Sequence, residues 1–191
     1  MTDLLLNTLN NFYSNIDNYK ELYDLINSNN GNNYISLRLV DWFVTNYSKK
    51  YNIIYLLDKK EKKIVYEKSN NTENIYQVNV FQEYKSQLKA FSKKRFDPFC
   101  RRERIEFVSH EMKINTTMGQ LNFFRWAINN RIIDYIKENK DIIEDDMNLS
   151  LKVTKDTGKK NKNGRKSRQE LSKSALRGLN KNKLSVCITF D

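Results

Sequence analysis

The sequence predicts an α+β protein: a mainly helical domain with a small antiparallel sheet, a basic flexible linker and a C-terminal strand. Apolar residues recur at three- and four-residue spacing through most of the chain up to residue 151, as in amphipathic helices. Two β-rich runs, NIIYLL and KIVYEK, flank the charged segment DKKEK and indicate a hairpin. The ending LSVCITF alternates in polarity and predicts a final strand that returns to the sheet.

These patterns divide the chain into four parts. We expect an N-terminal helical unit (1–33), a core α+β domain (34–151), a basic flexible linker (152–170) and a C-terminal helix turn and strand (171–191). The linker is expected because Lys, Asn, Gly, Ser and Thr dominate it, and such a composition cannot offset its ordering entropy.

Local signals locate the elements of the first two parts. The opening 33 residues read as two short amphipathic helices ended by an Asn-rich stretch, and Ser36 can cap the helix that follows. In the hairpin we expect the register to be set by Ile54, Leu56, Ile64 and Tyr66. Residues 69–74 read as a further loop.

A helix from Val80 should stop at Asp97-Pro98, because proline cannot continue α geometry, and residues 104–114 then read as a strand. Thr117 and Gln120 match a capping box, in which the threonine accepts from the third helical amide and the glutamine reaches back. That helix should run through Ile128, with a second run from Arg131 towards Asp146. We interpret the acidic run 144–146 as a solvated helix end.

The positive charge is concentrated in two segments. The formal net charge is +11. Residues 152–183 hold twelve Lys and Arg against Asp156 and Glu170, and residues 85–104 hold eight against Asp97 and Glu103. The rest of the chain is therefore mildly acidic. Concentrated like charges repel one another, whereas a polyanion releases counterions when it binds them, so we expect a nucleic acid partner, DNA or RNA.

The basic residues of the first segment alternate with aromatic ones, the combination that single-stranded nucleic acid sites use, although the aromatic rings are also good core residues. The expected phosphate contacts are Lys85, Lys89, Lys93, Lys94, Arg95, Arg101, Arg102 and Arg104 in this segment, and Lys159, Lys160, Lys162, Arg165, Lys166 and Arg168 in the tail. A second interpretation remains open, in which these charged residues only keep the protein surface soluble.

Asn122, Arg125 and Asn129 recur at i, i+3 and i+7 of the capped helix. Asn and Arg read adenine and guanine edges in a major groove, so these three are possible base-reading residues. The alternative is that this helix, apolar on most sides, is buried in the core.

Two other function classes stay open. Asp97 followed by Glu111 and Lys113 resembles the acidic and E-x-K pattern of restriction-type metal-dependent nucleases, although E-x-K is common in a Lys/Glu-rich chain. We nevertheless expect a protein that is not an enzyme. The third class is a structural or scaffold protein that binds an acidic partner.

Several chemistries are disfavoured by residue counts. His110 is the single histidine, and Cys100 and Cys187 are the two cysteines, so most His-based catalysis and a four-ligand zinc site lack residues. No Gly-rich phosphate loop and no apolar run of membrane-spanning length occurs in the sequence. We expect no cofactor, no bound metal and no membrane partner, and a cytosolic or nuclear protein.

Four segments carry a resemblance to a known family: SLRLVDWFVTNYSKK, YKSQLKAFSKKRFDPFCRRERI, TTMGQLNFFRWAINNRIIDYI, and the ending ELSKSA with SVCITFD. The sequence resembles an uncharacterised protein family of nucleocytoplasmic large DNA viruses, particularly mimivirus-like giant viruses, from about residue 35 onward. The resemblance implies work on viral DNA or RNA, or a place in the particle, and hence localisation in the host cytoplasm (viral factory) or virion. It supplies no catalytic residues.

Overall fold

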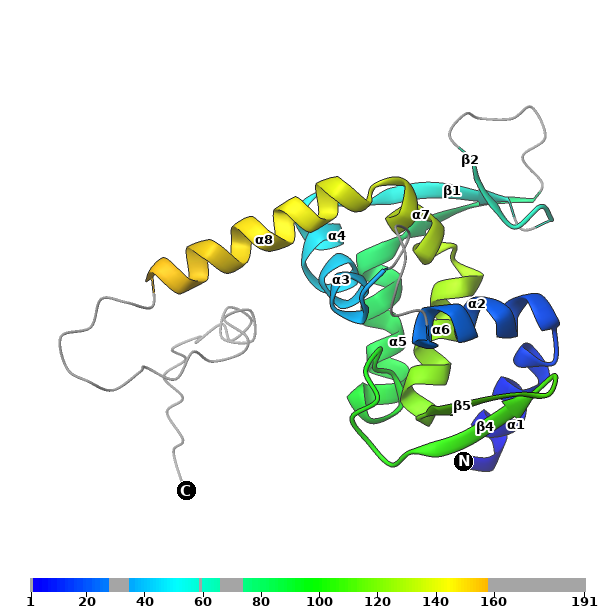
Figure 1. Cartoon of the computed structure of the whole chain (residues 1–191). Coiled ribbons are helices and arrows are strands. Elements are labelled where there is room, and N and C mark those ends of the chain that lie inside the picture. The colour runs from blue at the N-terminus through cyan, green and yellow to red at the C-terminus, as the bar shows by residue number, and fades with distance from the viewer. Residues whose placement is uncertain (1, 28–34, 59, 66–73, 158–191) are drawn as a thin grey trace, which may run out of the picture. The chain divides into compact units, whose positions relative to one another are not determined.

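A computed structural model describes residues 2–27, 35–58, 60–65 and 74–157 of the chain. By its internal contacts the chain divides into two units, 1–151 and 152–191, and the first contains the sheets and the packed core. This unit is a mainly helical α+β domain with small antiparallel sheets, as predicted (Figure 1). The predicted C-terminal strand and residues 158–170 of the predicted linker lie outside the described residues. Residues 152–157 of that linker instead continue the last helix.

The helices and strands have the following bounds. The helices are α1 (Thr2–Tyr13), α2 (Ile16–Asn27), α3 (Leu37–Trp42), the π-helical turn η1 (Phe43–Tyr47), α4 (Ser48–Lys50), α5 (Val80–Arg95), α6 (Met118–Asn129), α7 (Ile132–Glu138) and α8 (Lys140–Thr157). The strands are β1 (Ile54–Asp58), β2 (Lys63–Val65), β3 (Ile75–Asn79), β4 (Ile105–Ser109) and β5 (Met112–Thr116). Among the described residues, none of these helices combines the length and apolarity needed to cross a membrane.

The two N-terminal helices pack onto the core. The hydroxyl of Tyr13 donates to the Leu121 carbonyl on α6 at 2.8 Å, and that of Tyr19 donates to the Met112 carbonyl on β5 at 2.8 Å. Both tyrosines are completely buried. The helices that the sequence sets apart as residues 1–33 therefore belong to the same compact unit as the rest of the core.

The first sheet has three antiparallel strands in the order β2-β1-β3. The hairpin of β1 and β2 is as predicted, but β3 was not predicted from the sequence. The inward side chains of β1 are Tyr55 and Leu57, whereas Ile54 is exposed and Leu56 half-buried, so the predicted phase of this strand was wrong by one residue. Every residue of the IIYLL run is apolar or aromatic, so alternation could not reveal which side faces inward.

The second sheet is the hairpin of β4 and β5, where the sequence predicts one continuous strand. His110 and Glu111 form its two-residue turn, and both have left-handed backbone conformations, with φ of 49° and 62°. A two-residue hairpin turn needs positive φ at both positions to match the twist of the strands. The usual Asn-Gly signal is absent here, which is why the sequence did not indicate a turn.

A stack of aromatic rings joins the first sheet to the helices. Tyr135 of α7 stacks on Tyr55 of β1 and on Phe43 of η1, in each case with ring centroids 5.3 Å apart. Ser36 caps α3 as predicted, by accepting from the Leu39 amide at 3.1 Å. The ring contacts through Tyr135 place the helical stretch from α3 to α4 against the sheet.

Asp146 of α8 is buried, not part of the solvated helix end that the sequence indicated. Its carboxylate accepts hydrogen bonds from the Trp42 indole at 3.2 Å and the Tyr51 hydroxyl at 3.0 Å, and it pairs with the Lys50 ammonium. Burial alone would raise the pKa of this carboxyl, but the bonds from its three donors outweigh burial and hold the pKa below its ordinary value of 3.8. Asp146 therefore links α8 to α3 and α4.

We predict that Asp146→Asn lowers the stability of the protein near neutral pH and removes part of its acid sensitivity. A carboxyl with a lowered pKa in the folded state contributes stability above its unfolded pKa and loses it as the pH falls through the folded value. Urea unfolding of the wild type and the variant at pH 7 and pH 3 measures this, with Asp145→Asn, an exposed neighbour, as control. Equal losses between pH 7 and pH 3 in all three proteins would contradict the assignment.

Candidate nucleic-acid interface

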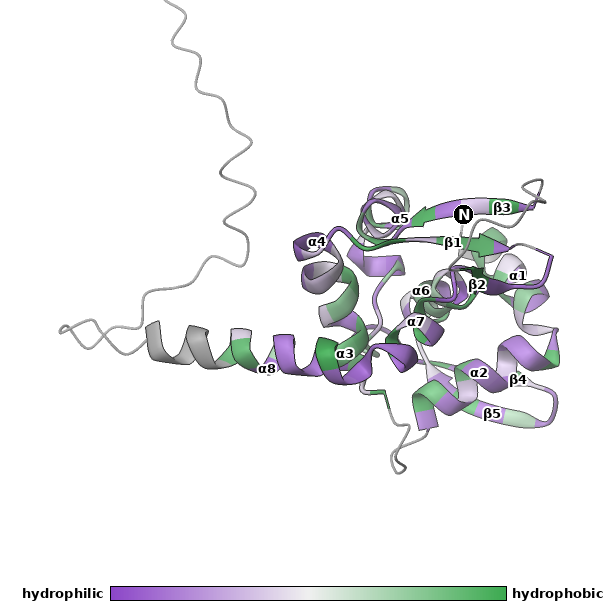
Figure 2. Ribbon diagram, turned by 90° about the horizontal axis from the view of Figure 1, so that it is seen from above, coloured by the Kyte–Doolittle hydropathy of each residue, from purple (hydrophilic) through white to green (hydrophobic). Residues whose placement is uncertain are grey.

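The regular part of α5 presents two exposed lysines, Lys85 and Lys89, as its sequence predicts. Lys49 of α4 joins them, because the ammonium groups of Lys49 and Lys85 each lie 5.6 Å from the centre of the half-buried Phe81 ring. Figure 2 shows α4, hydrophilic throughout, beside α5. Sequence reasoning missed Lys49, since only the tertiary contact between α4 and α5 brings it to this site.

The last turn of α5 is kinked. Ser92 has φ of 56° and ψ of 167°, which lies outside the helical region and kinks the helix. Lys93 is exposed, but because of the kink it does not continue the helical spacing of Lys85 and Lys89.

In the turn after α5, Arg101 is already engaged within the protein. Its guanidinium binds both carboxylate oxygens of Asp97, at 3.0 and 3.1 Å, and lies 4.4 Å from the Phe99 ring centre. The hydrogen bonds with Asp97 raise the pKa of Arg101. Arg102 and Arg104 are exposed.

Most of these cations form no ion pair with any described residue. Within the described part of the chain, no ion pair is formed by Lys85, Lys89, Lys93, Lys94, Arg102 or Arg104. Together with Lys49, Arg95 and Arg101 we call these residues the basic surface. The tail cations, Lys159 to Arg168, lie outside the described residues.

Polar side chains at the start of α6 hold this segment in place. Thr117 caps α6 by accepting from the Gln120 amide at 3.1 Å, as predicted. The Gln120 side chain does not reach back to the cap as the capping-box prediction required. Its Nε2 instead donates to the Pro98 carbonyl at 2.9 Å, and its Oε1 accepts from the Thr116 hydroxyl at 2.8 Å.

Two further contacts complete this anchor. The Asn122 Nδ2 donates to the Arg95 carbonyl at 2.9 Å, and the Asp97 amide donates to the Gly119 carbonyl at 3.2 Å. A Cβ on Gly119 would lie 3.3 Å from the Lys94 carbonyl oxygen, so glycine allows the two backbones to approach closely. The middle of the basic surface, from Arg95 to Pro98, is thus bonded to α6, whose side chains are mostly buried.

The aromatic residues of the segment lie mainly in the core. Tyr84 and Phe96 are buried and contact Trp126 of α6, with ring centroids 6.2 and 5.6 Å apart. Phe91 and Phe99 are half-buried. Tyr84 and Phe96 are therefore not accessible to bases, and the accessible rings are those of Phe81, Phe91 and Phe99.

The proposed base-reading row is not a surface row. Asn122 is completely buried and bonded to the Arg95 backbone, so it cannot read bases, and the alternative that this helix lies in the core holds for it. Arg125 is half-buried, and burial lowers its pKa, an effect that Tyr13 opposes. Asn129 is exposed at the end of α6. A helix that is buried on most sides cannot enter a groove.

The residues of the nuclease-like pattern lie in different settings. Asp97 binds Arg101, Glu111 occupies the exposed β4-β5 turn, and Lys113 pairs with Glu106 across the hairpin. Over the described ranges, no three His, Cys, Asp or Glu side chains lie close enough together to hold a metal ion. His110 is exposed and lies near Tyr19, with ring centres 6.1 Å apart.

The fold and this site define a class: a mainly helical α+β domain that carries an exposed basic surface on one helix and the turn after it. The chain belongs to the family described as "Family of unknown function (DUF7197)", whose model matches residues 1–191. The match includes the first 33 residues, which the resemblance seen in the sequence left out.

A relative in Acanthamoeba polyphaga mimivirus, named "Uncharacterized protein L507", is 39% identical over 153 residues. The alignment covers 76% of this chain and 52% of the relative, so the chain spans about half the length of the protein it matches. The expected resemblance to a mimivirus-like giant-virus family is confirmed. No solved structure matches the chain significantly.

We predict that Gln120→Ala lowers the free energy of unfolding by about 1–3 kcal/mol, because it leaves the buried Pro98 carbonyl without its donor. The exposed Gln82 of α5 provides a matched control, and Gln82→Ala should change the free energy of unfolding by less than about 0.5 kcal/mol. Urea denaturation measures both. If the two variants were equally stable, Gln120 would not anchor the turn.

Proposed function

We propose that the protein binds nucleic acid, DNA or RNA, by contacting phosphates through its basic surface. The observation that carries this proposal is the set of exposed cations on α5 and the following turn that make no ion pair in the described part of the chain. Folding gains nothing from crowding such charges, whereas a polyanion releases counterions on binding them. The similarity to a mimivirus protein supports a role in the host cytoplasm (viral factory) or virion.

The packing of the basic surface favours this function. Lys85 and Lys89 stand on a helix, and the Lys94–Pro98 backbone is bonded to α6, so binding loses little ordering entropy there. Phe81, between two lysines, offers a ring that a splayed base could stack on. With Asn122 buried, contacts to base edges are few, and we expect little sequence discrimination.

We predict that replacing Lys85 and Lys89 by Ala weakens binding and flattens its salt dependence. The slope of log Kobs against log salt should fall by about 0.9 for each lysine that contacts a duplex phosphate, or about 0.7 on single strands. Fluorescence anisotropy with labelled single-stranded and duplex DNA and RNA at several salt concentrations measures this.

Lys20→Ala combined with Lys60→Ala is the matched control, because these two lysines are exposed on α2 and next to β1, away from the basic surface. The control should keep the wild-type slope. A separate variant with Lys159, Lys160, Lys162, Arg165, Lys166 and Arg168 neutralised tests the proposed contribution of the tail. Wild-type slopes in both the helix and tail variants would exclude nucleic acid as the partner and favour a protein with an acidic surface.

A further inference from the structure

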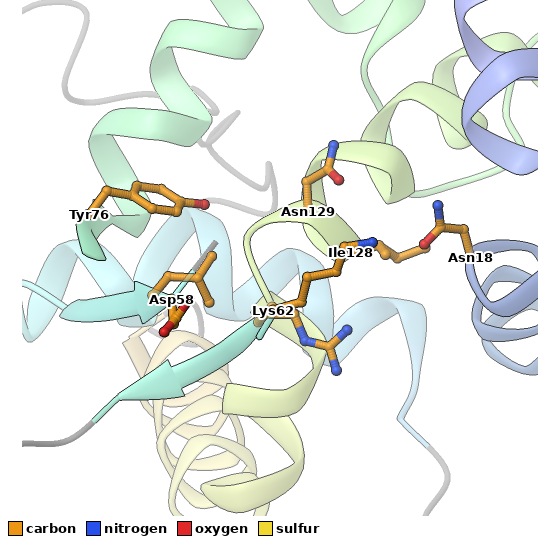
Figure 3. Close-up of a pocket in the computed structure, with 8 residues that line it drawn as sticks. Asn18, Asp58, Lys62, Tyr76, Ile128 and Asn129 are labelled. Carbon is orange, nitrogen blue, oxygen red and sulfur yellow. The ribbon is translucent and has the colours of Figure 1, made fainter. Parts of the chain in front are cut away.

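A cavity of about 230 Å³ lies between the first sheet, α2 and the junction of α6 with α7 (Figure 3). Leu57 of β1 and Ile128 of α6 supply apolar lining, Tyr76 of β3 supplies an aromatic ring, and Asp58 of β1 adds a carboxylate whose Oδ1 accepts from the Lys60 and Glu61 amides. The cavity is smaller than the roughly 300–1,000 Å³ of sites for drug-sized ligands. Its size therefore suits one planar ring system, and any larger substituent on that ring would extend out of the cavity.

Two asparagine side chains bring hydrogen-bonding groups to this cavity. The Asn18 Nδ2 donates to the Phe12 carbonyl at 3.0 Å, which fixes the amide, and its Oδ1 has no partner in the described part of the chain. The side chain of Asn129 makes no hydrogen bond within the same ranges. Paired amide donors and acceptors are the groups that recognise the edges of nucleobases.

Cationic residues with unusual backbone conformations lie on one side of the cavity. Lys62 and Arg131 both have left-handed conformations, with φ of 51° and 52°. Lys62 forms no ion pair in the described ranges, whereas Arg131 pairs with Asp134 and, at 3.6 Å, with Glu21. The Nε of Arg131 is buried and has no hydrogen-bond partner. Strain of this kind persists where surrounding structure holds it, often at ligand sites.

A second hollow, of about 290 Å³, shares Lys62 and Arg131 with the first. Its lining also includes Lys63, which pairs with Glu61, and Lys137, which pairs with Asp134, together with the carboxylates of Asp134 and Glu138. A ligand in the first cavity could therefore place an anionic group at Lys62 with room beyond it.

We propose that this cavity binds a nucleoside monophosphate, with the base against Leu57 and Ile128, the base edge at Asn18 and Asn129, and the phosphate at Lys62. A planar base matches the apolar and aromatic lining, its polar edge matches the amides, and its phosphate matches the unpaired ammonium. The site uses no residue of the basic surface, so it is separate from the nucleic-acid function proposed above.

Isothermal titration of the full chain with AMP, GMP, CMP, UMP and inorganic phosphate tests this site. At least one mononucleotide should bind saturably and more tightly than phosphate. Lys62→Met removes the ammonium, and Asn129→Trp fills the cavity mouth from an exposed position. Each should weaken binding about tenfold or more. Lys60→Met, an exposed lysine two residues from Lys62, should leave binding unchanged.

The proposal is overturned if none of the four nucleotides binds saturably, if phosphate alone binds as tightly, or if Lys62→Met and Asn129→Trp both bind like the wild type. Thermal unfolding confirms that each variant is folded. The Lys85→Ala, Lys89→Ala double variant should bind mononucleotides normally, so that failure of this site and failure of the polymer interface are separate results.

Discussion

The contact between the first turn of α6 and the end of α5 is the constraint on which the proposed interface depends. Gly119 lets the α6 backbone approach the Lys94 carbonyl, and the side chains of Gln120 and Asn122 then bond to the carbonyls of Pro98 and Arg95. These bonds satisfy buried polar groups that would otherwise destabilise the fold. They also fix the backbone from which the cations after the Ser92 kink project.

This anchor explains how a highly charged segment can belong to a well-packed protein. Tyr84 and Phe96 bury their rings against α6, while the residues between and after them present cations to solvent. One stretch of sequence thus supplies both buried rings and exposed cations. The packing of the buried rings determines where the exposed cations lie. Arg101 differs from its neighbours because it is paired with Asp97. Its charge therefore stabilises the turn and is less available to a phosphate.

Local signals in the sequence predicted much of the fold. The caps at Ser36 and Thr117 and the stop at Asp97-Pro98 are short-range features, and the structure contains each of them. The phase of β1 could not be predicted, because a wholly apolar run does not show which side chains face inward. The burial of Asp146 depends on donors from α3, α4 and the residue after α4, which no helical pattern reveals.

The candidate interface was likewise predicted only in its short-range features. Clustered charge identified the cations of α5 and the turn, since that property belongs to adjacent residues. The place of Lys49 beside Phe81 is a tertiary fact that the sequence did not predict, whereas the burial of Asn122 agrees with the alternative interpretation of its helix as a core helix.

Chemical-shift mapping tests the central claim most directly. Uniformly ¹⁵N-labelled protein titrated with a short oligonucleotide should show its largest amide shifts at Lys49, along α5 and through residues 93–104, and these shifts should weaken with added salt. Shifts confined to α1, α8 or the β4-β5 turn, with α5 unaffected, would contradict the account.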